Sequence, residues 1–338
     1  MKRTFYILLY ILVYLISLLP LRVLYGISDF LYIIVYTVWG YRKKIVRKNL
    51  TESFPEKGRD ELLAIEKGFY HWLCDYFVET IKLLSISRRN ISRRMTFKNK
   101  DMVRKSFDNG RNVVLYLGHY CNWEWVSTLP LHFDGYKERV VFGQIYHPLE
   151  NKPVNNLFLK LRGRAGAKSI SMVDTLRKII QMKRDGKQWI IGFIADQVPL
   201  LQNIHYWGDF LNHDTPFFSG TATIAKRFDT DVYYLDMKRT KRGFYVGEFH
   251  LMTTQPMVLS EEEITTIYAK KLEESIRRQP QFWLWTHNRW KRTHEEFNLR
   301  YDPKTGKFDT RDLDEIRREK SLSSIDNPVT TEQFCSRL

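Results

Sequence analysis

The 338-residue chain carries 54 lysine and arginine residues against 38 aspartate and glutamate residues, which gives a formal net charge of +16. This length allows one large domain with a substantial core. The charge favours an anionic partner such as nucleic acid, an acidic membrane surface, a phosphorylated lipid or an acidic protein. Three widely separated cysteines argue against a disulfide framework or a zinc site and favour a cytoplasmic catalytic part. With no Walker loop, dinucleotide fingerprint or internal repeat, nucleotide chemistry lacks its usual support.

The amino terminus predicts membrane attachment. An apolar stretch over residues 5–19 follows Lys2 and Arg3 and ends at Pro20. It is shorter than the ~20 residues that span a bilayer core, unless it continues past the proline to Leu24. No small-residue cleavage site follows it, so we expect a retained anchor and not a removable signal peptide.

A second apolar stretch over residues 30–39 contains several tyrosines and is preceded by Asp29. It is followed by a basic cluster of Arg42, Lys43, Lys44, Arg47 and Lys48. This arrangement is typical of an interfacial helix that rests on anionic headgroups. The alternative is that both apolar stretches are helices packed on a soluble domain.

The rest of the chain predicts an α/β fold. Apolar residues recur every three to four positions over residues 59–84, which indicates an amphipathic helix. Short β-branched and apolar runs predict buried strands at 112–117, 188–194, 231–235 and 244–249, and helical character is present at 173–184 and 220–228. When strands alternate with helices, active residues are expected where strands end.

Three segments follow from these patterns. Residues 1–50 form the predicted membrane anchor and interfacial helix, and residues 51–299 form the α/β domain. Residues 300–338 are charged and poor in large apolar side chains, so we expect a loosely ordered tail.

The run GHYCNWE at residues 118–124 contains the candidate catalytic residues. His119 follows a predicted strand and Gly118, which allows a sharp turn, while Asn122 can cap a helix whose first turn contains Glu124. A carboxylate bound to one imidazole nitrogen fixes the tautomer and raises the basicity of the other nitrogen. We therefore expect His119 to be a general base oriented by Glu124, although this spacing alone also occurs by chance in many proteins.

Two further groups are candidates for substrate or oxyanion contacts. Arg162 or Arg164 could stabilise an oxyanion or hold a phosphate of the acceptor. We prefer Arg162, because a surface charge is the slightly favoured interpretation of Arg164. Asp196 follows an apolar strand and could orient a side chain or contact substrate, in a role that Gln197 could share. A buried hydrogen-bonded turn residue is the competing interpretation of Asp196.

Several other polar residues are interpreted as structural. Cys121 is read as a small buried residue, because the chemistry needs no separate nucleophile. No set of metal ligands surrounds His213 and Asp214, so we expect no metal site. The remaining histidines in question, read as ordinary polar or packing residues, are His147, His205 and His287.

Four segments together resemble the bacterial lipid A late acyltransferase family, and the similarity covers roughly residues 5–297. They are the run GHYCNWEW from Gly118, the stretch from Tyr146 through Asn155, Asn156, Arg162 and Arg164 to Gly166, the strand end IADQ at 194–197, and WLWTHNRWK at 283–291. In related glycerolipid acyltransferases an aspartate more often stands at the position of Glu124, so the glutamate favours the lipid A branch. Asn212 stands where many relatives have glycine.

The resemblance implies a glycerolipid-acyltransferase-like α/β fold with a mixed central sheet. It also implies transfer of a fatty acyl chain, usually from acyl carrier protein, to a hydroxyl of an acyl chain on a lipid A precursor. The reaction would take place at the cytoplasmic face of the inner membrane, without a cofactor or a covalent enzyme intermediate. Acyl carrier protein, the lipid A precursor and the anionic inner membrane would be the partners.

Two other functions stay open at this point. The chain could acylate another membrane glycolipid or aminolipid, or it could be a non-catalytic lipid-binding protein that keeps the fold. Nucleic acid is disfavoured as a partner, because membrane segments are present and a recognition motif is absent.

Overall fold

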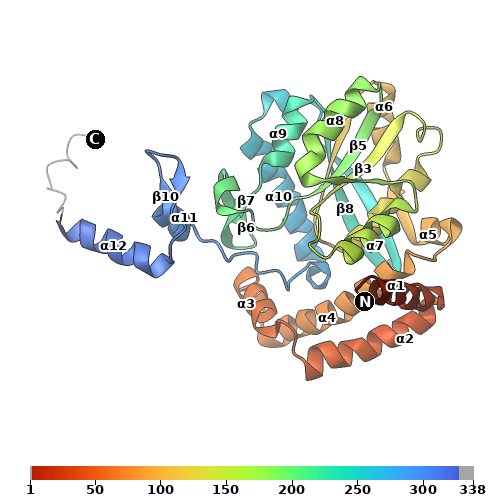
Figure 1. Ribbon diagram of the computed structural model, residues 1–338, viewed down its shortest axis with the longest axis horizontal. Coiled ribbons are helices and arrows are strands. Elements are labelled where there is room, and N and C mark those ends of the chain that lie inside the picture. Colours follow the sequence, from red (N-terminus) through yellow and green to blue (C-terminus); the bar gives the residue numbers. More distant parts are fainter. Residues whose placement is uncertain (1, 327–338) are drawn as a thin grey trace.

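The structure is a computed structural model that describes residues 2–326, and a seven-stranded mixed sheet forms its centre (Figure 1). The strand order is β1-β9-β8-β2-β5-β3-β4, and all neighbouring strands are parallel except β8 and β9. The strands are β1 (Met95–Lys98), β2 (Val113–Leu117), β3 (Val140–Tyr146), β4 (Lys168–Ser171), β5 (Gln188–Ile194), β8 (Asp231–Lys241) and β9 (Phe244–Thr253). This confirms the expected mixed sheet and its four predicted strands.

Helices cover both faces of the sheet. On one face lie α9 (Gly220–Arg227) and α10 (Glu261–Arg278), where Tyr116 of β2 stacks on Tyr268 with ring centres 4.6 Å apart. On the other face the 3₁₀ helix η2 (Trp123–His132) packs against β1 and β3. The remaining helices of the domain are α4 (Arg59–Lys82), α5 (Arg88–Arg94), α6 (Lys100–Asp108), α7 (Lys152–Gly163) and α8 (Thr175–Arg184).

A hairpin beside the sheet explains an unusual residue. Strands β6 (Tyr206–Phe210) and β7 (His213–Phe217) are joined by Leu211 and Asn212, whose φ angles are 52° and 62°. Asparagine tolerates this left-handed conformation better than other residues with a side chain. Asn212 therefore suits the backbone conformation of this turn.

The amino-terminal region forms a series of helices. They are α1 (Lys2–Leu18), α2 (Leu21–Tyr32), the π-helix η1 (Ile33–Val38) and α3 (Lys43–Ser53). The first apolar stretch does not continue through Pro20, since proline lacks the N–H that a continuing helix needs. Among the described residues, the helix long and apolar enough to cross a membrane by length and composition is Leu21–Val38.

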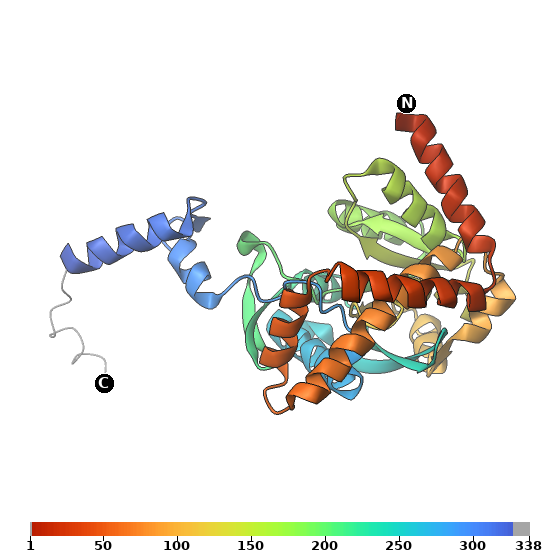
Figure 2. The ribbon, with the colours of Figure 1, turned by 90° about the horizontal axis from the view of Figure 1, so that it is seen from below.

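Helix α2 has two different faces. One face packs along α4, where the Tyr25 hydroxyl donates to Glu79 at 2.9 Å and Leu24 is fully buried. Seen from below, α2 lies across the near side of the molecule and α1 runs off at an angle (Figure 2). Val38 and Trp39, at the end of this helical stretch, are 77% and 70% exposed. The hydrophobic core thus extends across residue 50, and the division at that position stays a prediction.

The charged tail contains regular elements as far as it is described. A short hairpin of β10 (Tyr301–Asp302) and β11 (Lys307–Phe308) follows α11 (His294–Arg300) and leads to α12 (Leu313–Asp326). These elements extend away from the sheet (Figure 1), and α12 contacts α11. The expectation of a loosely ordered tail stays a prediction, and residues 327–338, including Cys335, lie outside the described residues.

Candidate active site

Two neighbouring strands bring the central residues together. Strands β2 and β5 are parallel, and Leu117 at the end of one lies opposite Ile194 at the end of the other. His119 and Asp196 each follow two residues later, so they lie at the same edge of the sheet. The sequence analysis expected active residues where strands end, and both of these candidate residues lie there.

Asp196 accepts three hydrogen bonds and orients His119. Its Oδ1 lies 2.6 Å from Nδ1 of the imidazole, and its Oδ2 accepts from the His119 backbone N–H at 2.8 Å. The indole N–H of Trp283 donates to the same Oδ2 at 2.8 Å. An ionised carboxylate can only accept, so the imidazole proton belongs on Nδ1 and Nε2 carries the lone pair of a base.

The charge of Asp196 is maintained although the side chain is buried. Burial by itself raises the pKa of a carboxyl group, but the charge that His119 carries when it is protonated and the three hydrogen bonds outweigh it and lower the pKa of Asp196 to about 2. Asp196 therefore stays ionised at neutral pH.

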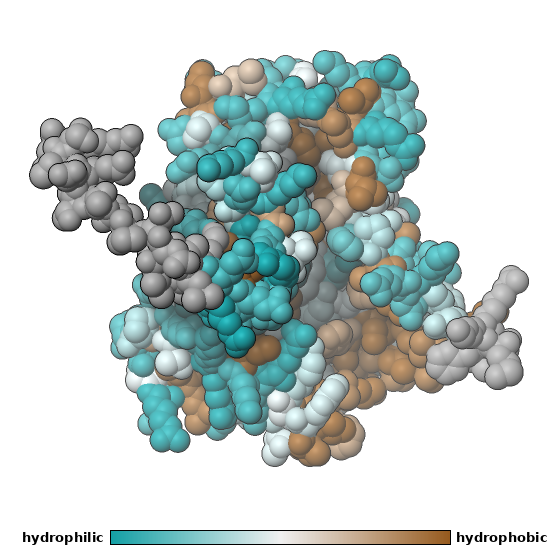
Figure 3. All heavy atoms as spheres, turned by 60° about the vertical axis from the view of Figure 1, so that its left-hand side comes forward, coloured by the Kyte–Doolittle hydropathy of each residue, from teal (hydrophilic) through white to brown (hydrophobic). Residues whose placement is uncertain are grey.

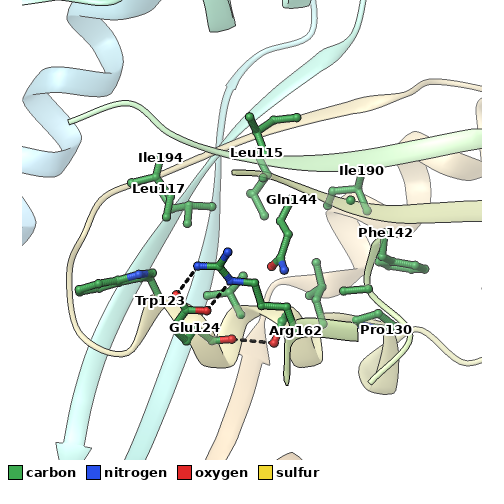
Figure 4. Close-up of a pocket in the computed structure, with 17 residues that line it drawn as sticks. Leu115, Leu117, Trp123, Glu124, Pro130, Phe142, Gln144, Arg162, Ile190 and Ile194 are labelled. Atoms are coloured by element: carbon green, nitrogen blue, oxygen red, sulfur yellow. Dashed lines mark hydrogen bonds and ion pairs between the residues drawn. The ribbon is translucent and has the colours of Figure 1, made fainter. Parts of the chain in front are cut away.

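The expected partnership between His119 and Glu124 is corrected. Glu124 binds Arg162 through two hydrogen bonds, of 2.6 Å to Nη2 and 2.7 Å to Nε. The two side chains are only 3% and 20% exposed, so this is a mostly buried bidentate pair. The physical reason is that η2 begins at Trp123 and its first turn directs Glu124 to Arg162 of α7 (Figure 4).

Asn122 caps η2, as expected, and also makes a second contact. Its Oδ1 accepts from the Trp125 N–H at 3.3 Å, and its Nδ2 donates to Glu79 at 2.7 Å. Glu79 is fully buried and also accepts from the hydroxyls of Tyr25 and Tyr245. Burial raises the pKa of this carboxyl group. The sequence analysis did not identify Glu79. The feature that could have drawn attention to it is a carboxylate among the apolar residues of α4.

The loop between His119 and η2 is held in a strained conformation. Cys121 has a φ of 53°, and its N–H donates to the Phe282 carbonyl at 2.8 Å, which lies in the 3₁₀ helix η6 (Pro280–Phe282). A Cβ at Gly118 would lie 2.6 Å from Leu272 and 3.3 Å from Asp196. Gly118 therefore allows Leu272 and Asp196 to pack closely against the backbone. The residue of the turn with a left-handed conformation is Cys121 and not Gly118.

The other predicted contact residues lie at different distances from His119. The side-chain nitrogen of Gln197 is 3.3 Å from Nε2 of His119, at the nitrogen that would act as base. Arg164 instead donates to the carbonyls of Leu83 and Ile86, at 2.7 and 3.4 Å. It therefore satisfies backbone groups just beyond the carboxyl end of α4, and the structure does not bring it to the histidine.

Behind the site lies a buried arginine. Arg289 is fully buried and donates to the Pro216 carbonyl at 2.6 Å, and burial lowers its pKa to about 10. Burial likewise lowers the pKa of the nearby His287 to about 4, so this histidine is neutral at pH 7. The interpretation of His287 as a packing residue stays a prediction.

An apolar pocket lies between η2 and the sheet, and the empty space of about 550 Å³ at this place includes the part that is open to solvent (Figure 4). Trp123 connects the pocket to His119, because it lines the pocket and its ring meets the imidazole edge-on at 5.1 Å. Most of the lining is aliphatic or aromatic, and Glu124 and Arg162 are its charged groups. Among the described residues, no group of three or more histidine, cysteine, aspartate and glutamate side chains could hold a metal ion.

Comparison with known proteins gives a family match. The sequence model of the family described as bacterial lipid A biosynthesis acyltransferase matches residues 1–292. A search of curated proteins gave no significant match. The matched range contains the whole central sheet, the pocket, and the two pairs His119–Asp196 and Glu124–Arg162.

Proposed function

The chain belongs to the bacterial lipid A biosynthesis acyltransferase family, and we propose that it transfers a fatty acyl chain from the thioester of acyl carrier protein to a hydroxyl of a lipid A precursor. The observation that carries this proposal is the oriented pair of His119 and Asp196 beside an apolar pocket. The pair supplies a base for a hydroxyl, and the pocket offers surroundings suited to an acyl chain.

In the proposed mechanism, Nε2 of His119 takes the proton of the acceptor hydroxyl as its oxygen attacks the thioester carbonyl. The imidazolium that forms is stabilised by the carboxylate of Asp196, which contacts Nδ1 at 2.6 Å. The tetrahedral intermediate then expels the thiolate, which receives the proton from His119. An ester bond forms, the thioester bond breaks, and no acyl group is attached to the enzyme.

We assign the pair of Glu124 and Arg162 to the entrance of the pocket. Two of the three guanidinium nitrogens of Arg162, Nε and Nη2, donate to Glu124, so the guanidinium group is held in a fixed orientation. We propose that Arg162 stabilises the oxyanion of the tetrahedral intermediate while Glu124 holds it in place. This keeps the role expected for Arg162 and gives Glu124 a positioning role.

The surface supports action at the cytoplasmic side of the inner membrane. Figure 3 shows hydrophobic residues gathered at the lower right of the molecule, at the level of α1 and α2 in Figure 1. Exposed apolar side chains of α2 and η1 include Phe30, Ile33 and Val38. The net charge of +16 favours both anionic lipid and an acidic carrier protein.

The test is turnover by His119→Ala in purified full-length protein, with an acyl carrier protein thioester and a tetra-acylated lipid A precursor. Loss of a general base lowers the rate about 10²–10⁴-fold, and the exposed His147→Ala serves as a matched control that should keep the wild-type rate. Undiminished turnover by His119→Ala would disprove the assignment of the base. Acylation of a different membrane lipid in place of the precursor would keep the chemistry and overturn the acceptor.

A further inference from the structure

The sheet side of the pocket is built in layers from neighbouring strands. At the entrance, Leu117 of β2 lies opposite Ile194 of β5. In the next layer, Gly192 of β5 lies between Leu115 of β2 and Gln144 of β3. Because side chains alternate along a strand, these residues face the same side of the sheet.

The deepest layer closes the pocket. Ile190 lies opposite Phe142, and both side chains are buried. Phe142 is held from behind by Phe133, whose ring centre lies 5.5 Å away. Ile194 follows Ile190 by four positions, and each position advances a strand by ~3.3 Å, so the floor lies ~13 Å from the entrance along β5.

The middle layer lacks a side chain at its centre. A Cβ on Gly192 would lie 3.3 Å from Cδ2 of Leu117 and 3.8 Å from the Gly143 carbonyl oxygen, and it would meet no other atom within 4 Å. A longer side chain at this position would therefore extend into the cavity. Figure 4 shows the space concerned, between Leu117, Leu115 and Gln144 on one side and Arg162 on the other.

We propose that Gly192 determines the length of the acyl chain that the enzyme accepts, with Ile190 and Phe142 as the stop at the end of the chain. This inference rests on the proposed function, because it takes the pocket to be the acyl site. The two uncharged polar side chains of the wall already have partners: the Ser127 hydroxyl donates to the Glu124 carbonyl at 2.6 Å, and the Gln144 amide nitrogen donates to the Ser169 hydroxyl at 3.2 Å. Most of the remaining wall offers apolar contact to a hydrocarbon chain.

Two substitutions should move the preferred chain length in opposite directions. Gly192→Val fills the middle layer with a residue that suits a central strand, so the enzyme should prefer shorter donors. Ile190→Ala lowers the floor, so it should prefer longer donors. Each methylene group that can no longer be buried should lower kcat/KM about fourfold.

Two other glycines provide controls. A Cβ on Gly143 would meet Ile170 and Ile191, both at 3.1 Å, and Ile191 belongs to the opposite face of the sheet. Gly143 lines the pocket only with its backbone, so Gly143→Ala perturbs the same strands from the opposite face without placing a side chain in the pocket. Gly163 lies at the end of α7, and a Cβ at this position would have no atom within 4 Å. Gly163→Ala should therefore have no steric effect, and it shows the variation of the product profile that comes from the assay alone.

The experiment gives the full-length wild-type protein and each variant a mixture of acyl carrier protein thioesters of increasing chain length, and mass spectrometry identifies the products. We expect shorter products from Gly192→Val, longer products from Ile190→Ala, and the wild-type profile from both controls. Gly192→Ala is included because its Cβ displaces only the flexible end of Leu117, so a weaker shift to shorter products should survive even if the valine variant does not fold.

The two levels of the proposal fail separately. If the wild-type protein transfers no acyl chain from any donor, the proposed function is wrong. If the wild-type protein is active but Gly192→Ala, Gly192→Val and Ile190→Ala give its unchanged product profile, the function stands and Gly192 does not determine chain length.

Discussion

Nδ1 of His119 lies 2.6 Å from the carboxylate of Asp196, although 77 positions separate the two residues in the chain. The contact depends on the parallel pairing of β2 with β5, which aligns the two strand ends. The carboxylate five positions after the histidine has a different partner, Arg162. The base and its orienting group therefore come from different strands.

The first prediction concerns Asp196→Asn. An asparagine can donate to Nδ1 and so stabilise the tautomer in which Nε2 carries the proton and cannot act as a base. We expect kcat to fall about 10²–10⁴-fold, with wild-type substrate binding. The measurement is single-turnover transfer, together with circular dichroism to show that the fold is kept.

A matched control for this change is Asp185→Asn, an exposed aspartate that follows α8. It should leave turnover unchanged. An Asp196→Asn variant with wild-type kcat would show that the contact is only structural.

The second prediction is a double-mutant cycle on Glu124 and Arg162. Glu124→Gln and Arg162→Met each leave one member of a mostly buried ion pair without its partner, which costs about 3–5 kcal/mol. The double variant should recover most of this free energy of unfolding, because no unpaired charge remains. Turnover should stay low in all three variants if Arg162 stabilises the oxyanion.

Chemical denaturation in detergent provides the stabilities and the transfer assay provides the rates. Recovery of turnover in the double variant, in parallel with stability, would contradict the oxyanion role. Single variants as stable as the wild type would contradict the buried ion pair itself.

Much of the fold could be predicted from local sequence patterns. The runs that became β2 and β5 are almost continuously apolar because helices cover both faces of the sheet. Strand β3 was missed because its burial is irregular, so no period marks it. Helix α10 was also missed, although Ser260 and Glu263 form a capping box that the sequence contains.

The candidate site was harder to predict than the fold. The sequence identified Asp196 as a possible orienting group after a strand, but the choice between it and Glu124 depends on strand pairing, which sequence spacing does not contain. Glu79 was missed because its partners, Tyr245 among them, are distant in the chain. The pairing of Glu124 with Arg162 likewise connects η2 to α7. The sequences of these two elements do not show that they lie side by side.

The third prediction concerns stability at acidic pH. His132 ends η2, and its Nε2 is buried without a hydrogen-bond partner among the described residues. Burial, with a contribution from Lys100, lowers its pKa from 6.5 to about 4. The unfolded chain therefore binds this proton at a higher pH than the folded chain does, and stability decreases as the pH falls from 6.5 to 4.

The effect should be about 2–3 kcal/mol at pH 4 for this one group. His132→Gln removes the titration, so its free energy of unfolding should vary less between pH 7 and 4.5 than that of the wild type. The exposed His147→Gln should show the wild-type dependence. Equal pH dependence in all three proteins would mean that His132 is not buried in its neutral form.

The fourth prediction concerns the membrane face of α2 and η1. Since one side of this helical stretch packs along α4, its exposed apolar side is available for insertion into the headgroup region without crossing the bilayer. A fully buried valine or phenylalanine side chain contributes ~1.5–3 kcal/mol to such binding, so Phe30→Asp and Val38→Asp should each weaken vesicle binding about tenfold or more. Val258→Asp is the control, because Val258 is 74% exposed but lies beside α9, away from α2.

Vesicles containing anionic lipid, sedimented with the full-length variants, measure this binding directly. Single cysteines placed at residues 20 and 39 of a variant in which native cysteines are replaced then test the orientation of the helix. A helix that lies in the plane of the membrane leaves both positions accessible to a membrane-impermeant reagent from the same side. Labelling from opposite sides would show that Leu21–Val38 crosses the bilayer, and its packing along α4 would then have to be released on insertion.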